Sequence, residues 1–293
     1  MTKKVVLFGA SGFIGKAILS ELKSELFDVI PIRSKASRPQ VKAEIASISI
    51  DFHNSQECRK ILEEIRPDVI VSAAWYTALP DYRQSELNVK FMESTINLAR
   101  IAHNVGTSHL IILGTSAEYG HSNLECNSSS SIPNPVDLYS KCKFETYKEI
   151  SWLLSGSATK LSWLRIFQPF GKYQDSSRLI PYLISECRAG RSPRLLDPDR
   201  ISDWISIEDI ASALVFAMRN SLPEVIDVGS GIGTTNRELA NWIIEISGAH
   251  ISESGTSKTC LEAKGLVVSK KSPVFQAGWH PRVNLRTYLA QTY

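Results

Sequence analysis

The chain has 293 residues, 43% of them hydrophobic and 22% charged, which is typical of a globular protein with a large core. Its net charge is only +3 and its basic residues are dispersed, so no nucleic-acid partner is indicated. The odd number of cysteines, with no CxxC pair, argues against a disulfide framework or a metal site and favours a reducing cytoplasm. They are Cys58, Cys126, Cys142, Cys187 and Cys260. The first apolar run stops at Gly9, before a signal-peptide core or a membrane span could form, so we expect no membrane association.

Short apolar runs alternate with segments of helical periodicity from the start of the chain. The expected strands are Val5–Phe8, Val29–Ile32, Val69–Ser72, Leu110–Leu113 and Ser162–Phe167. The expected helices are Lys16–Leu26, Gln56–Ile65, Val89–His103 and about Leu138–Leu154. Apolar strands that alternate with amphipathic helices are typical of the α/β class with a doubly wound parallel sheet.

The pattern becomes irregular in two places. The polar stretch Ser122–Asp137 predicts a functional loop rather than a helix or strand. After Phe167 the alternation breaks down, and we expect only a last strand at Val225–Val228 and a helix at Asn236–Ile246, with Thr234 or Thr235 as its N-cap. We therefore expect a large domain from residues 1–167 and 203–228, and a smaller, discontinuous one from 168–202 and 229–293.

A glycine-rich turn with GxxGxxG spacing lies between the first expected strand and its helix. Glycines there permit a tight turn and let a pyrophosphate approach the helix N-terminus, as in dinucleotide-binding sites. A connection that merely needs glycine is the plainer alternative. The residues expected to contact a dinucleotide are Gly9, Ser11, Gly12, Phe13, Ile14 and Gly15.

The end of the second strand indicates which dinucleotide binds. An acidic residue there would hold the adenosine ribose 2′-hydroxyl, whereas this chain has Arg33, followed by Ser34 and Lys35. Cations and a hydroxyl donor suit a 2′-phosphate, so we expect NADP, used as NADPH, with NAD as the alternative. The other interpretation is that Arg33 and Lys35 are solvated charges at a loop.

Four polar side chains indicate a proton-transfer site. Tyr139 and Lys143 are four residues apart at the head of a helix, and a nearby ammonium is expected to lower the pKa of the tyrosine. Alone, this pair is more typical of a helix surface. Thr115 and Ser116 follow the strand Leu110–Leu113, at the strand end where open α/β sheets bind ligands. We expect Thr115, with Ser116 as alternate, to bind the reacting oxygen opposite Tyr139, although such hydroxyls also serve as caps.

Further short motifs keep the order and separation found in one known family. They are GASGFIG, Asp51-Phe52, the run Ala73 to Trp75, Asn88, TSAEYG, YSKCK, RIFQPFG, Leu179-Ile180-Pro181, Asp203-Trp204-Ile205 and Glu208-Asp209. On these motifs, nearly the whole chain resembles the extended short-chain dehydrogenases of the NAD-dependent epimerase/dehydratase family, which act on nucleotide sugars. The resemblance implies a Rossmann dinucleotide-binding domain, a separate substrate-binding domain and a homodimer.

The resemblance also implies roles for particular residues. It places the adenine between Asp51 and Phe52, the dinucleotide along Ala73, Ala74 and Trp75, the nicotinamide end at Phe167 and Pro169, and the nicotinamide ribose on Lys143. Most of these residues are equally at home in a core or a turn. Asn88 is expected to be structural.

Departures from the family pattern narrow the reaction. Dehydratases of the family carry an Asp-Glu pair after the threonine, where this chain has Ser116-Ala117, so the acid and base for elimination are missing. Epimerases recycle a bound NAD, whereas net reductases consume NADPH, and Arg33 favours reduction. The usual Asn of the RIFN segment is Gln168, and the usual Arg before the Asp-aromatic-Ile segment is Ser202.

The expected substrate contacts follow from these departures. Diphosphate binding is expected from some of Arg178, Arg194 and Arg200, because guanidinium groups suit phosphate oxygens. Ser116, Gln168 and Leu179 complete the expected substrate-binding set. The expected reaction is NADPH-dependent reduction at C4 of a nucleotide-linked 4-keto-6-deoxy sugar, with the proton from Tyr139. A nucleotide-sugar epimerase with tightly bound NAD is the second interpretation, and a non-catalytic NADP-binding protein is the third.

Overall fold

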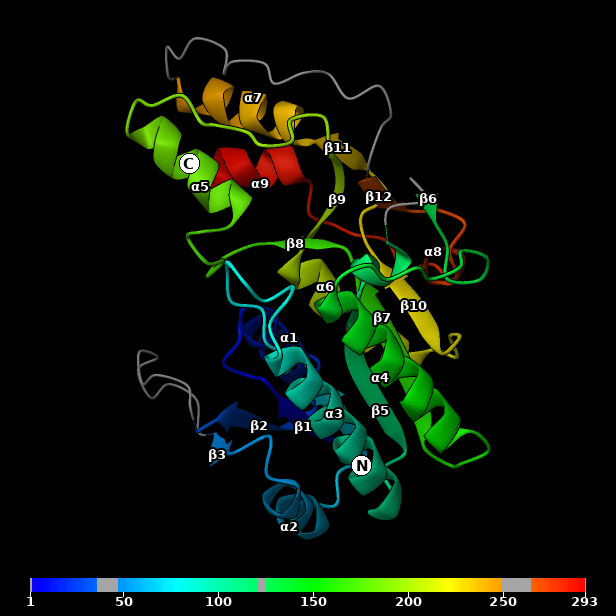
Figure 1. The fold of residues 1–293 in the computed structure, drawn as a ribbon. Helices are drawn as coiled ribbons and strands as arrows, with labels where there is room; N and C mark the ends of the chain where they lie inside the picture. Colours follow the sequence, from blue (N-terminus) through cyan, green and yellow to red (C-terminus); the bar gives the residue numbers. More distant parts are fainter. Residues whose placement is uncertain (1, 36–46, 121–124, 249–264, 293) are drawn as a thin grey trace.

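A computed structural model describes residues 2–35, 47–120, 125–248 and 265–292. Cys260 and residues 122–124 of the expected polar loop lie outside these ranges. Seven parallel strands form the main sheet in the order β10-β7-β5-β4-β1-β2-β3, flanked by helices (Figure 1). They are β1 (Lys4–Phe8), β2 (Asp28–Ser34), β3 (Ile48–Ile50), β4 (Val69–Ser72), β5 (His109–Thr115), β7 (Lys160–Ile166) and β10 (Val225–Val228). The expected doubly wound parallel sheet is confirmed.

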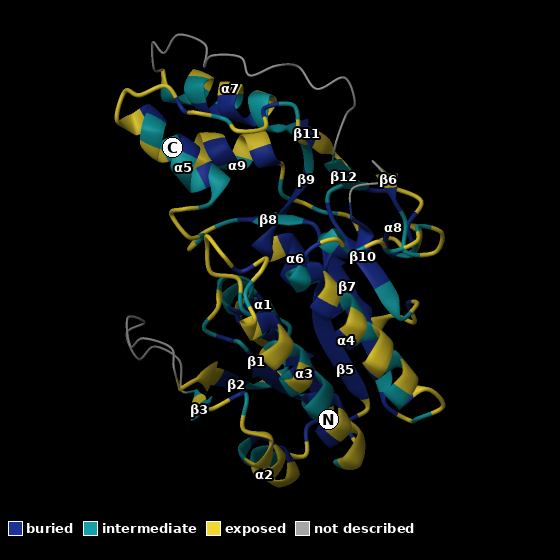
Figure 2. Ribbon diagram, viewed as in Figure 1, coloured by how far each residue is buried: buried dark blue, intermediate teal, exposed yellow. Residues whose placement is uncertain are grey.

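Both faces of the main sheet are covered, because successive side chains of a strand point to opposite sides. Val5 and Leu7 of β1 belong to one hydrophobic core, whereas Val6 and Phe8 belong to another. The first core is covered by α1 (Phe13–Ser24) and α6 (Ile207–Arg219), the second by α2 (Ser55–Ile65), α3 (Leu87–Asn104) and α4 (Leu138–Leu154). Figure 2 shows the resulting contrast between buried strands and exposed outer helix faces.

A smaller lobe stands beyond one end of the main sheet, at the top of Figure 1. Its helices are α5 (Leu179–Arg188), α7 (Asn236–Ser247) and α9 (Leu285–Thr292), and they share a third hydrophobic core with Phe170 and Trp204. The associated short strands are β6 (Glu125–Cys126), β8 (Gln168–Phe170), β9 (Ile201–Ser206), β11 (Gly233–Thr235) and β12 (Gly265–Val268). β9 pairs with β8, β11 and β12, and β12 also pairs with β6.

The C-terminal segment contributes to both lobes. Helix α8 (Pro273–Gln276) packs against β10, and Val268 and Trp279 belong to the first core of the main sheet. The buried carboxylate of Asp203 in β9 accepts backbone N–H bonds from Ser230, Gly231 and Val268. The Asp-aromatic-Ile motif therefore joins β9 to the loop after β10 and to β12.

Several expected elements have the bounds predicted for them. Strands β4 and β10 and helix α4 match their expected limits, and Thr235 is the N-cap of α7. Strand β7 ends at Ile166, one residue before the expected Phe167. Helices α5 and α6 and the short strands around β9 were not expected. The polar stretch Ser122–Asp137 was also expected to contain no strand, which is wrong for β6, because Glu125 and Cys126 pair with β12 from a distant part of the chain.

Candidate active site

The glycine turn is closely packed against the end of β4. Gly9 has a φ of +79°, and a Cβ on it would lie 2.8 Å from the Ala73 carbonyl carbon and the Ala74 backbone nitrogen. A Cβ on Gly15 would lie 2.0 Å from the Gly9 carbonyl oxygen. Both positions therefore require glycine, the first also because L side chains disfavour positive φ. The helix that follows this turn begins at Phe13. Its N-cap, Gly12, provides no side-chain hydrogen bond, and its first turn has no acidic residue.

A cleft of about 440 Å³ opens beside this helix N-terminus, at the carboxyl ends of β1, β4, β5 and β7. Nine of the expected cofactor residues line it: Gly12, Phe13, Ile14, Gly15, Ala73, Trp75, Lys143, Phe167 and Pro169. The others lie outside its lining: Gly9, Ser11, Arg33, Ser34, Asp51, Phe52 and Ala74. Thr115, Ser116 and Tyr139 line the same cleft, so the structure brings the glycine turn and the expected catalytic residues together.

The end of β2 carries the residues expected to select the dinucleotide. Arg33 and Ser34 are exposed there, and Lys35 forms an ion pair with Glu57 of α2, with 2.5 Å between the Lys35 Nζ and a Glu57 oxygen. The other Glu57 oxygen accepts the N–H of Asp51 at 3.1 Å. Of these two cations, Lys35 is therefore the one whose charge is paired with a carboxylate of the protein. Phe52 is buried and packs on Phe8, which gives it a core role as well.

Tyr139 lies in the first turn of α4, is largely buried and lines the cleft. Its hydroxyl is hydrogen-bonded to the Thr115 side chain. The Thr115 hydroxyl also accepts the Ala117 N–H at 3.2 Å, as the N-cap of the short helix η1 (Ser116–Tyr119). The bond between Thr115 and Tyr139 lowers the pKa of Tyr139, as expected when Thr115 donates its proton to the Tyr139 oxygen. The hydroxyl proton of Tyr139 is then free to point into the cleft.

Lys143 is buried and faces the main chain rather than Tyr139. Its Nζ donates to the Leu113 carbonyl at 2.6 Å and lies 3.7 Å from the centroid of the Trp75 ring. Burial lowers the pKa of Lys143 to about 7, and the carboxylate of Glu118 opposes this shift. The charge of Lys143 therefore changes near neutral pH.

The expected lowering of the Tyr139 pKa by Lys143 is wrong for this structure. Burial raises the pKa of Tyr139 above its usual range, and the hydrogen bond from Thr115 only partly offsets it. Lys143, whose Nζ donates to the Leu113 carbonyl, is not among the largest causes of this shift. Tyr139 therefore holds its proton at neutral pH, which is the form required of a proton donor.

Among the cleft residues that the sequence analysis missed, Tyr82 and Arg83 contact Tyr139 directly. The Tyr82 ring meets the Tyr139 ring edge-on at 5.2 Å. The Arg83 guanidinium pairs with Asp137, the N-cap of α4, and the Arg83 carbonyl accepts the Tyr139 N–H at 3.0 Å. The segment before α3 thus orients Tyr139 through both its ring and its backbone. No local motif marks these residues, because their role depends on how this segment folds against α4.

The expected substrate residues separate into two groups. Ser116, Gln168, Arg178 and Arg200 line the cleft, and Arg178 donates to the Thr77 carbonyl at 2.6 Å. Leu179 and Arg194 instead line a second pocket of about 570 Å³ in the smaller lobe.

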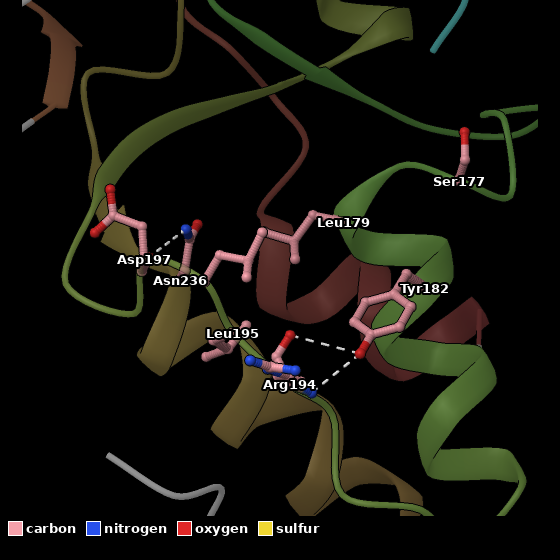
Figure 3. Close-up of a pocket in the computed structure, with 8 residues that line it drawn as sticks. Ser177, Leu179, Tyr182, Arg194, Leu195, Asp197 and Asn236 are labelled. Carbon is pink, nitrogen blue, oxygen red and sulfur yellow. Dashed lines mark hydrogen bonds between the residues drawn. The ribbon is translucent and has the colours of Figure 1, made fainter. Parts of the chain in front are cut away.

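Figure 3 shows the second pocket between α5, the loop that follows it and the start of α7. The Tyr182 hydroxyl accepts the Arg194 backbone N–H at 3.0 Å, and the Asn236 side-chain amide donates to the Asp197 carbonyl at 2.7 Å. These bonds use backbone groups of the loop, so the Arg194 guanidinium and the Asp197 carboxylate are not consumed by them. The other lining residues are Ser177, Leu179, Leu195 and Leu196.

Comparisons with known proteins agree with this geometry. A family model described as the NAD dependent epimerase/dehydratase family matches residues 5–229. A dTDP-6-deoxy-L-talose 4-dehydrogenase (NAD(P)(+)) from Kitasatospora kifunensis is 26% identical, over 97% of this chain and 92% of that protein. A UDP-glucose 4-epimerase from Lactobacillus helveticus is 22% identical, over 95% and 92%. The structure of Thermus thermophilus UDP-glucose 4-epimerase complexed with NAD has a TM-score of 0.84 at 20% identity, covering 98% of this chain and 96% of that one.

Proposed function

The chain belongs to the NAD dependent epimerase/dehydratase family, and we propose that it uses NADPH to reduce a nucleotide-linked 4-keto-6-deoxy sugar at C4. One observation carries this proposal. Tyr139 lines the cleft as a neutral phenol, whose pKa burial raises further, and accepts a hydrogen bond from Thr115. A protonated phenol is ready to act as the acid of a reduction, whereas elimination or epimerisation requires a base first. Ser116 and Ala117 supply neither the acid nor the base of elimination.

The residues present fit a dinucleotide. Gly9 and Gly15 leave room where a Cβ would clash, and Gly12 leaves the N–H groups at the start of α1 without a side-chain cap. Free N–H groups at a helix N-terminus favour a pyrophosphate. When bound, the dinucleotide supplies the hydride of the reaction. Trp75, Phe167 and Pro169 line the part of the cleft in which we propose the nicotinamide end binds.

Arg33 is the residue proposed to select NADPH. Its guanidinium is exposed at the end of β2, while Lys35 is paired with Glu57. We expect Arg33→Ala to weaken NADPH binding about tenfold and to leave NADH binding unchanged, because only NADPH carries the 2′-phosphate. Fluorescence titration with each dinucleotide measures this. Equal losses for both would show that Arg33 does not recognise the 2′-phosphate.

The proton transfer is assigned to residues of β5 and α4. Tyr139 donates its hydroxyl proton to the oxygen that forms at C4, and Thr115 holds the Tyr139 oxygen in place through the hydrogen bond between them. To orient the reacting oxygen as well, Thr115 must turn its single proton from Tyr139 to that oxygen, and Ser116 is the alternate donor. Lys143 binds the nicotinamide ribose in this proposal. To do so, its Nζ must exchange the Leu113 carbonyl for a ribose hydroxyl.

The substrate is proposed to span both pockets. The sugar lies beside Tyr139, and the diphosphate lies near Arg178 and Arg200, whose guanidinium groups suit phosphate oxygens. The nucleoside extends into the second pocket, toward Leu179 and Arg194.

This assigns dinucleotide binding to residues 1–167 and 203–228 and substrate binding to 168–202 and 229–293. We also propose a homodimer, which sedimentation equilibrium tests.

The names of the relatives support oxidoreduction at C4 of a deoxy sugar. Besides the dTDP-6-deoxy-L-talose enzyme, a GDP-6-deoxy-D-talose 4-dehydrogenase from Aggregatibacter actinomycetemcomitans is 24% identical, over 83% of this chain and 80% of that protein. Both names describe a dehydrogenase of a 6-deoxy sugar at position 4. The reverse of that reaction is the reduction proposed here.

A nucleotide-sugar 4-epimerase with bound NAD is the second candidate. The observation that favours it is the Lys35–Glu57 pair, which removes one cation from the region proposed for the 2′-phosphate. Mass spectrometry of gently purified protein distinguishes the two candidates. Stoichiometric NAD that survives purification would favour the epimerase.

The test of the proposed reaction is a panel of nucleotide-4-keto sugars offered with NADPH and with NADH. Cofactor oxidation followed by absorbance is expected with at least one 6-deoxy member of the panel, and faster with NADPH. Interconversion of nucleotide sugars without net cofactor oxidation would contradict the reductase and support the epimerase.

A further inference from the structure

Glu118 lies directly beneath the catalytic residues and is fully buried. One carboxylate oxygen accepts the Thr115 N–H at 2.9 Å and the Trp163 indole N–H at 3.0 Å. The other oxygen accepts the Arg165 Nε–H at 2.7 Å. A buried carboxylate is strongly destabilising unless it is paired and hydrogen-bonded, and here every bond comes from β5 or β7. The position of Glu118 is therefore closely specified.

Gly114 leaves the space that Glu118 occupies. A Cβ on Gly114 would lie 2.2 Å from the Trp163 Nε1 and 2.8 Å from a Glu118 carboxylate oxygen. Those are closer than real Cβ contacts, so any other residue at 114 would displace one of these side chains. The position of the Glu118 carboxylate therefore depends on the absence of a side chain at Gly114.

Glu118 and Lys143 hold the same short stretch of β5 from two sides. The Lys143 Nζ donates to the Leu113 carbonyl, and the Glu118 carboxylate accepts the Thr115 N–H, two residues further on. This backbone carries the Thr115 hydroxyl that bonds to Tyr139. A shift of either contact would move Thr115 relative to Tyr139.

The charged and titratable groups that act on Lys143 and Tyr139 come from η1 and from the segment before α3. Glu118 of η1 raises the pKa of both Lys143 and Tyr139. Arg83, from the segment before α3, acts on Tyr139 in the opposite direction, and Tyr82 acts in the same direction as Glu118. Trp75, after β4, offers Lys143 an uncharged aromatic face. Glu118 is thus the group that opposes the effect of burial on the pKa of Lys143.

Further charges stand behind Glu118. The Arg165 Nη1 donates to the Tyr119 hydroxyl at 2.9 Å, and that hydroxyl donates to Asp227 at 2.8 Å. Burial raises the pKa of Asp227 to about 6. These bonds help to hold Arg165, the ion-pair partner of Glu118, in place.

We propose that Glu118 is a positioning residue of this active site: its carboxylate fixes the Thr115 backbone and supplies a buried negative charge that acts on Lys143 and Tyr139. It acts through these residues and does not line the cleft itself. The inference rests on the proposed function for its catalytic meaning. The two effects, charge and position, are separable by substitution.

Glu118→Gln tests the charge. The amide keeps an oxygen for the Thr115 N–H but removes the negative charge. The affinities for NADPH and for NADP⁺ are measured by fluorescence titration from about pH 5 to about pH 9, and their ratio is plotted against pH. We expect the midpoint of this curve to fall by about one pH unit, because Lys143 would lose its proton at a lower pH. The matched control is Glu186→Gln, which removes an α5 carboxylate that is paired with Arg191. We expect it to leave the midpoint unchanged. A folded Glu118→Gln protein with the wild-type midpoint would overturn the proposal.

Glu118→Gln leaves Arg165 without its partner and can fail to fold for that reason. The double variant Glu118→Gln with Arg165→Gln removes both charges and keeps hydrogen-bonding side chains. We expect the same downward shift of the midpoint in the double variant, because Glu118 acts on Lys143 directly. An unchanged midpoint would overturn the proposal equally.

Glu118→Asp tests position. The charge remains, but the side chain is one methylene too short to hold Thr115 and Arg165 together. We expect the wild-type midpoint, faster hydrogen exchange of the Thr115 amide, and a kcat lowered about tenfold with KM unchanged. Wild-type exchange and kcat would refute the positional role. If no nucleotide sugar is turned over by the wild type, the proposed function fails, while the midpoint and exchange still decide the role of Glu118.

Discussion

The cleft and the second pocket are built differently. In the cleft, Thr115, Tyr139 and Lys143 each have polar partners from the ends of buried strands or from α4. In the second pocket, Arg194 and Leu196 lie on an exposed loop, and Leu196 is 88% exposed. Under the proposed function, the chemical step would depend on buried, hydrogen-bonded side chains, and substrate recognition would depend on accessible ones. Changes in the cleft should therefore lower kcat or alter stability, and changes in the pocket should raise KM.

The largest expected effect is that of Tyr139→Phe. Loss of the phenolic proton should lower kcat by about 10³-fold, while the ring contacts with Tyr82 and Trp75 and the binding of NADPH remain. Tyr182→Phe is the matched control, since it removes a tyrosine hydroxyl from the second pocket and should change KM only. Steady-state kinetics and NADPH titration measure both. A Tyr139→Phe protein with wild-type kcat would contradict the assignment.

Thr115→Val should have the next largest effect. Valine keeps the shape but removes the hydroxyl that bonds to Tyr139, so we expect kcat to fall about 10²-fold. Ser116→Ala is the comparison, with an expected loss of less than about threefold. The opposite order of the two losses would transfer the role to Ser116.

Lys143→Met tests whether burial of the Lys143 ammonium lowers the free energy of unfolding. The pKa of Lys143 is about 7, against an ordinary 10.5, so between these values the unfolded chain binds the extra proton. The wild-type free energy of unfolding therefore rises with pH across this window, and the penalty is fully present below about pH 7. We expect Lys143→Met to be more stable at pH 7 by on the order of 2 kcal/mol, and the gain to disappear above about pH 10. Denaturant unfolding at both pH values measures this, and a gain independent of pH would contradict it.

Arg194→Met should have the smallest effect. Methionine keeps much of the apolar stem but removes the guanidinium from the second pocket, so we expect KM for the nucleotide sugar to rise about fivefold with kcat unchanged. Arg191→Met, outside the pocket lining, is the control. A fall in kcat without a change in KM would contradict the assignment of the chemical step to the cleft and of substrate recognition to the second pocket.

Local periodicity explains what the sequence predicted correctly. The alternation of strand and helix from β1 to β7 follows from runs such as Val69–Ser72, whose buried strands need no distant partner to be recognised. The close spacing of Tyr139 and Lys143, and the position of Thr115 after an apolar strand, were also predictable, because both lie within single elements. The structure brings all three to one cleft.

The features that were missed depend on contacts between distant segments. β6 exists only because it pairs with β12, more than a hundred residues away. The direction of the Lys143 ammonium depends on Leu113 and Trp75, which helical spacing alone could not show. Helix α6 was the one avoidable omission, since Ser206 as N-cap and two acidic residues in the first turn mark its start.

The most direct test of the proposed reaction follows the hydride itself. A nucleotide-linked 4-keto-6-deoxy sugar is offered with NADPH that carries deuterium on the transferred position, and the product is analysed by NMR and mass spectrometry. The proposal predicts one deuterium at C4 of the sugar and one NADP⁺ formed for each product molecule. Product without deuterium at C4, or altered configuration at C4 without NADPH oxidation, would contradict it.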